Sequence, residues 1–285
     1  MAPTAATRDV ALEGMSLHCE IWGDSDAPPL LLVHGLRAFG RWFHSVGAAL
    51  GRDYRLIAPD LRGRNLSSWA PDGDYRIATY VRDLAALADH LGLGRFALAG
   101  HSLGGRISTA FAAAYPDRVA ALMLLDSSPE PDPAGMARIR AEVEHMPDRF
   151  ASWDAAEGFL RALHSKASPL DIEIRLACML RETEPGTIEW RIDPACTRQG
   201  PGDAASAWAA LAAVAAPTMI LRAAESDVLS EAVHRRMLAA CARAEAAYVE
   251  AAGHMVLEDN PAATARAMAR FLAANYPATR ARLDA

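Results

Sequence analysis

Short, uninterrupted apolar runs alternate along this chain with longer segments in which apolar residues recur every three or four positions. Apolar runs without polar alternation are typical of strands that are buried on both faces of a sheet. The longer periodic segments indicate amphipathic helices, and strands that alternate with helices predict a parallel sheet. A hairpin over residues 10–22 is expected at the sheet edge. The expected strands are residues 30–33, 55–58, 96–99, 119–125, 218–221 and 247–250, and the expected helices are residues 38–50, 80–91, 103–115, 204–213, 231–241 and a last one from Pro261.

The alternation breaks between residues 127 and 203, where no apolar run predicts a core strand. A structureless loop of this length is uncommon in a compact domain. Periodic apolar positions inside the segment predict helices instead. We therefore expect one α/β core, formed by residues 1–126 and 204–285, that carries a helical insertion over residues 127–203.

Residues 100–104 read Gly-His-Ser-Leu-Gly, which fits the pattern Gly-x-Ser-x-Gly and lies between an expected strand and an expected helix. That context gives the motif its weight, because the turn must be sharp enough to lift the serine above the sheet. Without the context, an ordinary glycine-rich turn would be the simpler interpretation. The motif predicts a strained Ser102 whose hydroxyl is a nucleophile at the start of a helix that favours negative charge.

A serine nucleophile needs a base, and the base needs an acid that orients it. In this kind of site the acid and the histidine follow the serine in the order Ser, Asp, His. His254 follows the last expected strand, and Asp227 follows the strand before it. We therefore predict Ser102, Asp227 and His254 as the catalytic residues. Asp126 is the rival acid because it also ends a strand, and we favour Asp227 for its place one strand before His254.

The strand over residues 30–33 ends in a His-Gly-Leu turn. The backbone N–H groups of Leu36 and Leu103 are expected to form an oxyanion hole, because the second follows the nucleophile directly. His34 is interpreted as a residue that organises this turn, and His101 as a packing residue.

Several of these motifs together resemble the α/β-hydrolase family, in its large group of esterases, lactonases and C–C hydrolases. The resemblance runs from about residue 18 to about residue 271. It implies a mostly parallel central sheet flanked by helices, the catalytic set given above, and a helical cap over the active site at residues 127–203. The motifs that carry it are residues 32–35 (Leu-Val-His-Gly), 58–63 (Ala-Pro-Asp-Leu-Arg-Gly), 100–104, 226–227 (Ser-Asp) and 253–255 (Gly-His-Met).

One position departs from the family pattern. Relatives usually read Arg-Gly-x-Gly-x-Ser where residues 62–67 here read Arg-Gly-Arg-Asn-Leu-Ser. Asparagine is the non-glycine residue that best accepts a positive φ, so we expect Asn65 to preserve the turn.

These features predict a serine hydrolase that cleaves a small or medium carboxylic ester or lactone through an acyl-enzyme, without a cofactor. A C–C bond hydrolase or a perhydrolase could use the same residues. Met255 counts mildly against the C–C hydrolase, whose relatives tend to carry Trp there. A third alternative is a non-enzymatic or slow-turnover ligand receptor, which turnover of a p-nitrophenyl ester would exclude. The expected substrate-binding residues are Trp42, Phe150, Trp153, Phe159 and Met179.

Composition narrows the choice of partners. The chain has 285 residues, 52% of them hydrophobic, and a formal net charge of −6, with no basic block of the kind that binds nucleic acid. No His-Glu-x-x-His or related spacing predicts a metal site. The N-terminus lacks the apolar stretch of a signal peptide, and no membrane span is expected. Widely spaced cysteines fit reduced thiols, so we expect a cytoplasmic protein with a small-molecule ester or lactone as substrate; a homodimer stays open.

Overall fold

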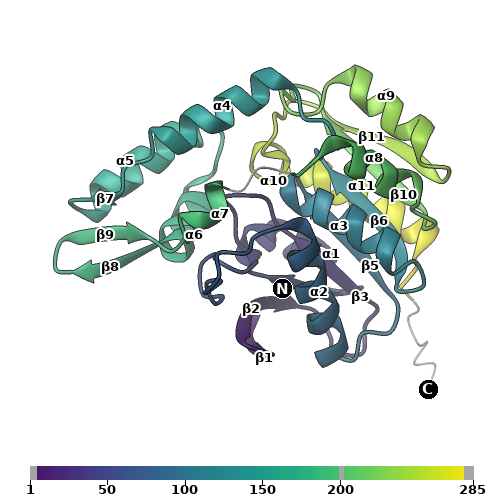
Figure 1. The fold of residues 1–285 in the computed structure, drawn as a ribbon, viewed down its shortest axis with the longest axis horizontal. Helices are drawn as coiled ribbons and strands as arrows, with labels where there is room; N and C mark the ends of the chain where they lie inside the picture. The colour runs from purple at the N-terminus through teal and green to yellow at the C-terminus, as the bar shows by residue number, and fades with distance from the viewer. Residues whose placement is uncertain (1–4, 199–201, 279–285) are drawn as a thin grey trace.

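The computed structural model describes residues 5–198 and 202–278. Its centre is an eight-stranded sheet (Figure 1). The strands are β1 (Ala6–Leu12), β2 (Met15–Trp22), β3 (Pro29–Val33), β4 (Arg55–Pro59), β5 (Phe96–His101), β6 (Val119–Leu125), β10 (Thr218–Ala223) and β11 (Ala244–Val249). Their order across the sheet is β1-β2-β4-β3-β5-β6-β10-β11. β2 pairs antiparallel with β1 and with β4, and every other pair in this sheet is parallel, so the predicted fold class is confirmed.

Helices cover both faces of the sheet, which explains why the strands are apolar without alternation. In β5, Phe96 and Leu98 belong to the apolar cluster on one face, whereas Ala97 and Ala99 belong to the cluster on the other. Successive side chains of a strand point to opposite faces, so both faces must be apolar when both are covered. One face carries α2 (Ile77–His90), α3 (Leu103–Ala114), α8 (Ala204–Ala212) and α9 (Glu231–Ala240), and the other carries η1 (Gly40–Phe43), α1 (His44–Leu50), α10 (Val256–Asp259) and α11 (Pro261–Asn275).

Residues 127–203, called the inserted segment below, follow β6 and contain α4 (Pro133–Glu144), β7 (Arg149–Phe150), α5 (Trp153–Leu163), α6 (Pro169–Met179), β8 (Leu180–Glu184), β9 (Thr187–Trp190) and α7 (Ala195–Arg198). In Figure 1 this segment extends beyond one end of the central sheet. The sequence analysis expected helices here and missed the small antiparallel sheet β7-β9-β8. The reason is that β8 is exposed and polar after its first residue, so it lacks an apolar strand pattern. The division into two domains stays a prediction.

Two backbone features of the described residues bear on the predictions. Asn65 has φ +45°, so the expected substitution of asparagine for glycine in a left-handed turn is confirmed. Among residues 5–198 and 202–278, no helix is both long enough and apolar enough to cross a membrane.

Candidate active site

The turn between β5 and α3 holds Ser102 in a strained conformation. Ser102 has φ +53° and ψ −118°, in the left-handed half of the map that non-glycine residues rarely occupy. A Cβ atom on Gly100 would lie 2.3 Å from the carbonyl oxygen of Gly104, and one on Gly104 would lie 2.0 Å from that of Val33. Only glycine therefore fits at both positions, and the predicted sharp turn is confirmed.

Ser102, His254 and Asp126 form a continuous series of hydrogen bonds, called the Ser–His–Asp series below. The Oγ atom of Ser102 lies 3.0 Å from Nε2 of His254, and Nδ1 of the same ring lies 2.8 Å from Oδ2 of Asp126. A carboxylate can only accept, so the proton on this ring belongs on Nδ1. Nε2 is then free to accept the hydroxyl proton of Ser102, which is the arrangement that activates a serine.

The prediction that Asp227 contacts His254 is wrong. Asp227 forms an ion pair with Arg138 instead, with 2.5 Å between Oδ2 and Nε. Hydrogen bonding to that guanidinium lowers the pKa of the Asp227 carboxyl. Ser226 explains the geometry, because its hydroxyl accepts backbone N–H groups of Val228 and Leu229 at 3.2 and 3.0 Å. This tight turn faces Ser226 toward the Asp126 carboxylate and sends the next side chain outward.

Asp126 occupies the place that was assigned to Asp227. It directly follows β6, has φ +44° and is fully buried. Its Oδ1 atom accepts the backbone N–H of Ala223 at 3.0 Å, and its Oδ2 atom accepts the hydroxyl of Ser226 at 2.7 Å. These two bonds come from the end of the neighbouring strand β10 and fix the carboxylate against His254. The sequence signal for Asp126 was its position at a strand end, which it shared with Asp227.

Two further histidines hold the backbone around the series. His34 accepts the N–H of Leu61 at Nε2 (2.9 Å), so its Nδ1–H donates to the carbonyl oxygen of Gly35 (2.8 Å). Burial lowers the pKa of His34 to about 3, which keeps it neutral. His101 contacts the carbonyl oxygen of His254 through Nε2 at 2.8 Å, and burial lowers its pKa well below the ordinary value. His34 therefore organises its turn and His101 packs against the Trp42 and His254 rings, as predicted from the sequence; the contact of His101 with the His254 carbonyl oxygen was not foreseen.

The expected oxyanion donors lie beside the nucleophile. Leu36 and Leu103 line the same cavity as Ser102. Leu103 is the first residue of α3, so its N–H has no acceptor within the helix. The carbonyl oxygen of Leu36 accepts Nε of Arg64 at 3.2 Å, which fixes the orientation of that turn. Their role in stabilising an oxyanion stays a prediction.

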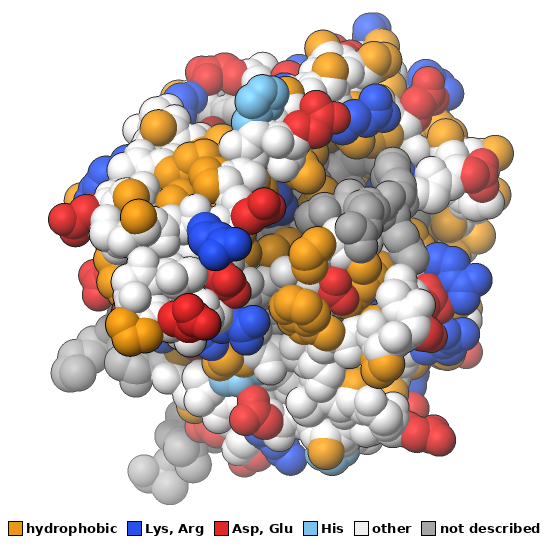
Figure 2. Space-filling view, turned by 60° about the vertical axis from the view of Figure 1, so that its left-hand side comes forward, with side chains coloured by type: hydrophobic (Ala, Val, Ile, Leu, Met, Phe, Trp, Pro, Cys, Tyr) orange, Lys and Arg blue, Asp and Glu red, His pale blue; other side chains and the backbone are white. Residues whose placement is uncertain are grey.

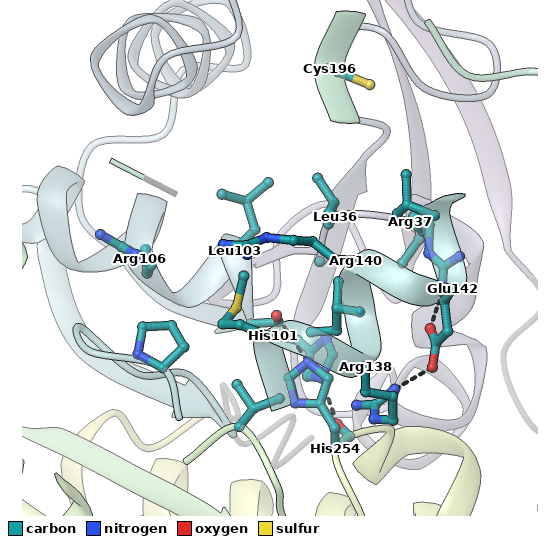
Figure 3. A pocket seen from close by; sticks show the side chains of 18 of the residues that line it. Leu36, Arg37, His101, Leu103, Arg106, Arg138, Arg140, Glu142, Cys196 and His254 are labelled. Atoms are coloured by element: carbon teal, nitrogen blue, oxygen red, sulfur yellow. Dashed lines mark hydrogen bonds and ion pairs between the residues drawn. The ribbon is translucent and has the colours of Figure 1, made fainter. Parts of the chain in front are cut away.

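A cavity of about 870 Å³ opens at the Ser–His–Asp series. Ser102 and His254 line it from the core, and the inserted segment contributes apolar side chains from α4, α5, α6 and β9. Figure 3 shows His254 beside the α4 residues Arg138, Arg140 and Glu142 at this cavity. Figure 2 shows one face of the molecule. Hydrophobic side chains lie in a hollow near its centre, and charged side chains surround the hollow. The contributing apolar residues of the inserted segment include Met136, Val143, Leu160, Leu163, Met179 and Trp190.

Among the five predicted substrate-binding residues, Met179 lines this cavity. The prediction is wrong for the four aromatic residues. Trp42 is 2% exposed, packs against His101 and donates its Nε1–H to Glu258. Phe150 and Phe159 pack with Trp190 inside the inserted segment, and Trp153 is exposed on its surface. Large aromatic side chains are more often part of a core than of a binding surface. Trp42, Phe150 and Phe159 follow this tendency, because all three pack against other rings.

The residues that the sequence analysis missed are charged. Five arginines and two glutamates line the cavity, although the whole chain carries a formal net charge of −6. Arg37 and Arg138 both bind Glu142, as the dashed lines in Figure 3 show. The arginine content of residues 133–144 was the one feature of the sequence that could have indicated charged residues at the cavity. The other charged lining residues are Arg76, Arg106, Arg140 and Glu144.

A buried ion pair joins the inserted segment to the core near His254. Arg175 of α6 and Glu258 of α10 are 1% and 2% exposed, with 2.8 Å between Nε and Oε1. Trp42 donates to the same oxygen at 2.7 Å, and His164 lies 3.3 Å from the other. Burial opposes ionisation of Glu258, but Arg175 and His164 outweigh it and lower its pKa.

No group of three or more His, Cys, Asp or Glu side chains suited to a metal ion occurs among the described residues. Cys19, Cys178, Cys196 and Cys241 are buried free thiols, and none lies in the Ser–His–Asp series.

The chain belongs to the α/β-hydrolase family: the family profile described as alpha/beta hydrolase fold matches residues 28–261. It is 30% identical over 270 residues to the 3-hydroxybutyrate-oligomer hydrolase of Cupriavidus necator, which covers 89% of this chain and 92% of that protein. The crystal structure of E-2-(acetamidomethylene)succinate hydrolase superimposes with a TM-score of 0.86 and 26% identity, over 94% of this chain and 99% of that one. An α/β hydrolase from Novosphingobium aromaticivorans gives a TM-score of 0.77 and 30% identity, over 95% and 99%. The protein is therefore a hydrolase by family.

Proposed function

We propose that this protein is a serine hydrolase that cleaves a small or medium carboxylic ester or lactone through an acyl-enzyme. Ser102 is the nucleophile, His254 the general base and Asp126 the orienting acid. The observation that carries the proposal is the Ser–His–Asp series, with hydrogen bonds of 3.0 and 2.8 Å, at the wall of a cavity of about 870 Å³. A nucleophile, a base and an orienting group in this order are what acyl transfer requires.

In the first half of the reaction, the Ser102 oxygen attacks the ester carbonyl while Nε2 of His254 takes the hydroxyl proton. The carbonyl oxygen becomes negative, and the N–H groups of Leu36 and Leu103 stabilise it. One such donor contributes about 3 kcal/mol of transition-state stabilisation in known hydrolases. His254 then gives its proton to the departing alkoxide, which leaves as the alcohol, and the acyl group stays on Ser102.

In the second half, water attacks the acyl-enzyme. Nε2 of His254 removes one water proton and returns it to the Ser102 oxygen as the carboxylic acid leaves. Asp126 holds the Nδ1–H tautomer and stabilises the imidazolium in both halves, without taking the proton itself. The cycle needs no cofactor.

The inserted segment acts as a cap in this proposal. Its apolar side chains face the same cavity as Ser102, and Arg175 ties it to the core four residues from His254. Strands of a parallel sheet present their reactive groups at the carboxyl ends, and the segment follows β6 at that edge. A cap in this place limits the size of the acyl and alcohol groups and keeps bulk water from the intermediate.

The relatives support ester chemistry. By its name, the relative from Cupriavidus necator hydrolyses an oligomer of 3-hydroxybutyrate, and a hydroxy acid forms such oligomers through ester bonds. The similarity covers most of both chains, so the same class of bond is the first substrate class to test here.

The test is Ser102→Ala against Ser25→Ala, a matched change in an exposed turn. With p-nitrophenyl butyrate, Ser102→Ala is expected to lower kcat/KM by at least about 10⁴-fold, the scale seen when one member of such a set is removed. Ser25→Ala should keep the wild-type rate. Circular dichroism and thermal melting establish that both variants are folded. A folded Ser102→Ala protein that hydrolyses the ester like the wild type would overturn the proposal, and so would a wild type without turnover of any ester or lactone.

A further inference from the structure

One arginine of the cavity is buried and has no partner in the described part of the chain. Arg106 lies in α3, is 9% exposed and lines the cavity together with Ser102. It forms no hydrogen bond or ion pair through its side chain with any described residue, and its Nε atom is enclosed without an acceptor. A buried guanidinium without an acceptor is costly, because water no longer solvates it and nothing else does.

The other cavity arginines differ from Arg106 in this respect. Arg37 and Arg138 bind Glu142, and Arg76 binds Asp74 with two hydrogen bonds of 2.8 and 2.7 Å. Arg140 is exposed on α4, so water can solvate it. These four cations are therefore paired or exposed, whereas Arg106 is buried and its Nε–H has no acceptor among the described residues.

The nearest opposite charge does not replace a partner. Asp203 attracts Arg106 electrostatically, but its carboxylate oxygens accept the N–H groups of Ala205 and Ser206 at 2.8 and 3.1 Å. Burial lowers the pKa of Arg106, yet a guanidinium stays protonated at neutral pH. The side chain thus keeps a full charge and free donors at the wall of the cavity.

The position of Arg106 suits an anion on a substrate that reacts at Ser102. Ser102 directly precedes α3, the N–H of Arg106 donates to the carbonyl oxygen of Ser102 at 3.3 Å, and both residues line the same cavity. Figure 3 shows Arg106 on the side of the pocket opposite Arg37, Glu142 and Arg138, with His254 between them. Arg106 also lines a smaller cavity of about 190 Å³, so its side chain lies between two cavities. A planar guanidinium binds a carboxylate with two parallel hydrogen bonds.

We propose that Arg106 binds a free carboxylate of the substrate, and that the preferred substrates are esters that carry this second, ionised acid group a few bonds from the ester carbonyl. The inference rests on the proposed hydrolase function of the same site.

The first test compares monoethyl succinate with ethyl succinamate, which replaces the carboxylate by a neutral carboxamide of the same shape. The measured quantity is the ratio of kcat/KM for the two esters. Arg106→Gln is expected to lower this ratio about 100-fold, as loss of one partner of a buried charge pair does. Arg106→Lys keeps the charge but loses the paired donors, so it should retain part of the ratio.

Arg140→Gln is the matched control, because it removes the same charge from an exposed arginine at the same cavity. Its ratio should stay within about threefold of the wild type. The proposal is overturned if Arg106→Gln keeps the wild-type ratio, or if Arg140→Gln lowers the ratio as much as Arg106→Gln does. The wild type must also prefer the charged ester; a preference for ethyl succinamate overturns the proposal as well.

The second test does not depend on turnover. In the Ser102→Ala background, succinate is expected to bind by calorimetry and to raise Tm, and adding Arg106→Gln should weaken its binding at least about tenfold. Arg106→Met replaces Arg106→Gln if the latter does not fold. A wild type that turns over no ester or lactone would defeat the proposed function, while succinate binding still decides the role of Arg106. Equal binding with and without Arg106 would overturn the inference.

Discussion

The central sheet and the inserted segment are stabilised in different ways. Strands such as β5 and β6 are buried along their whole length between two layers of helices, and two large apolar clusters fill the space. The inserted segment has one apolar cluster of six buried residues. Its links to the core include the charged or hydrogen-bonded pairs Arg37–Glu142, His44–Asp171, Arg138–Asp227 and Arg175–Glu258.

Residues of the site are therefore positioned in two ways, either by strand pairing in the sheet or by side-chain pairs between the inserted segment and the core. Residues at strand ends are positioned by backbone pairing, so their places follow from apolar patterns along the chain. The pairs that join the inserted segment to the core connect residues up to 127 positions apart, as with His44 and Asp171. A pattern of apolar and polar residues along the chain cannot predict such a pair, because its two members are far apart in the sequence. The core therefore provides the reactive groups, and the inserted segment provides contacts that depend on how it packs.

The largest expected effect distinguishes the two aspartates. Asp126→Asn should lower kcat/KM for p-nitrophenyl butyrate about 10⁴-fold, because an amide at this place favours the wrong tautomer of His254. Asp227→Asn removes only the surface pair with Arg138 and should change the rate by less than about threefold. Steady-state kinetics on both folded variants gives the answer. A larger loss in Asp227→Asn than in Asp126→Asn would contradict the hydrogen-bond series.

The second effect concerns the buried pair that joins the inserted segment to the core. Arg175→Met leaves the Glu258 carboxylate buried with only Trp42 and His164, and should reduce the free energy of unfolding by about 3–5 kcal/mol. Urea unfolding measures it.

The control is Arg161→Met, which removes an exposed pair with Glu157 on α5 and should cost less than about 1 kcal/mol. The double variant Arg175→Met with Glu258→Gln should recover more than half of the loss, because no carboxylate is then left unpaired. Equal losses in the two arginine variants would mean that the buried pair does not hold the inserted segment.

A smaller effect depends on pH. The pKa of His34 is about 3 in the folded protein, against about 6.5 for an unperturbed histidine. The folded-state pKa is depressed, so the stability contributed by neutral His34 is present above pH 6.5 and is lost as the pH falls toward 3. His34→Asn should destabilise the protein at pH 7.5, and this difference from the wild type should shrink by about 2 kcal/mol at pH 5.

The difference in unfolding free energy between His34→Asn and the wild type isolates the titration of His34, because the other titrating residues are the same in both proteins. Ser25→Ala, a change in an exposed turn that removes no titrating group, should show a small difference that is the same at both pH values. Chemical unfolding at the two pH values provides the data. A constant difference for His34→Asn would show that the pKa of His34 is the same in the folded and the unfolded protein.

The smallest effect concerns the acyl chain. Met179 lines the cavity and Trp153 does not, although both belong to the inserted segment. Met179→Ala should change the relative kcat/KM of p-nitrophenyl acetate and octanoate about tenfold, since apolar contact discriminates by about 1–3 kcal/mol per methylene-sized change. Trp153→Ala should leave the ranking of chain lengths as it is. An unchanged ranking in Met179→Ala would show that this side chain does not contact the acyl group.

Local sequence was sufficient for much of the site. Gly-x-Ser-x-Gly between a buried strand and a helix placed Ser102, because the close approach of Gly100 to the Gly104 carbonyl lies within the motif itself. His254 followed from its position after the last strand, and the left-handed Asn65 followed from the glycine of the family pattern and from the tolerance of asparagine for a positive φ. These positions depend on backbone geometry, which short-range patterns specify.

Only the tertiary structure decided between Asp126 and Asp227, because both follow a strand at the same edge of the sheet. The difference arises from the Ser226 turn, which faces one side chain inward and the next one outward. The same holds for Trp42 and for Arg106, whose surroundings come from distant segments. The sequence by itself determined where the chain turns and which residues reach the strand ends. Side-chain direction and burial depend on contacts between segments far apart in the sequence, so they became clear only in three dimensions.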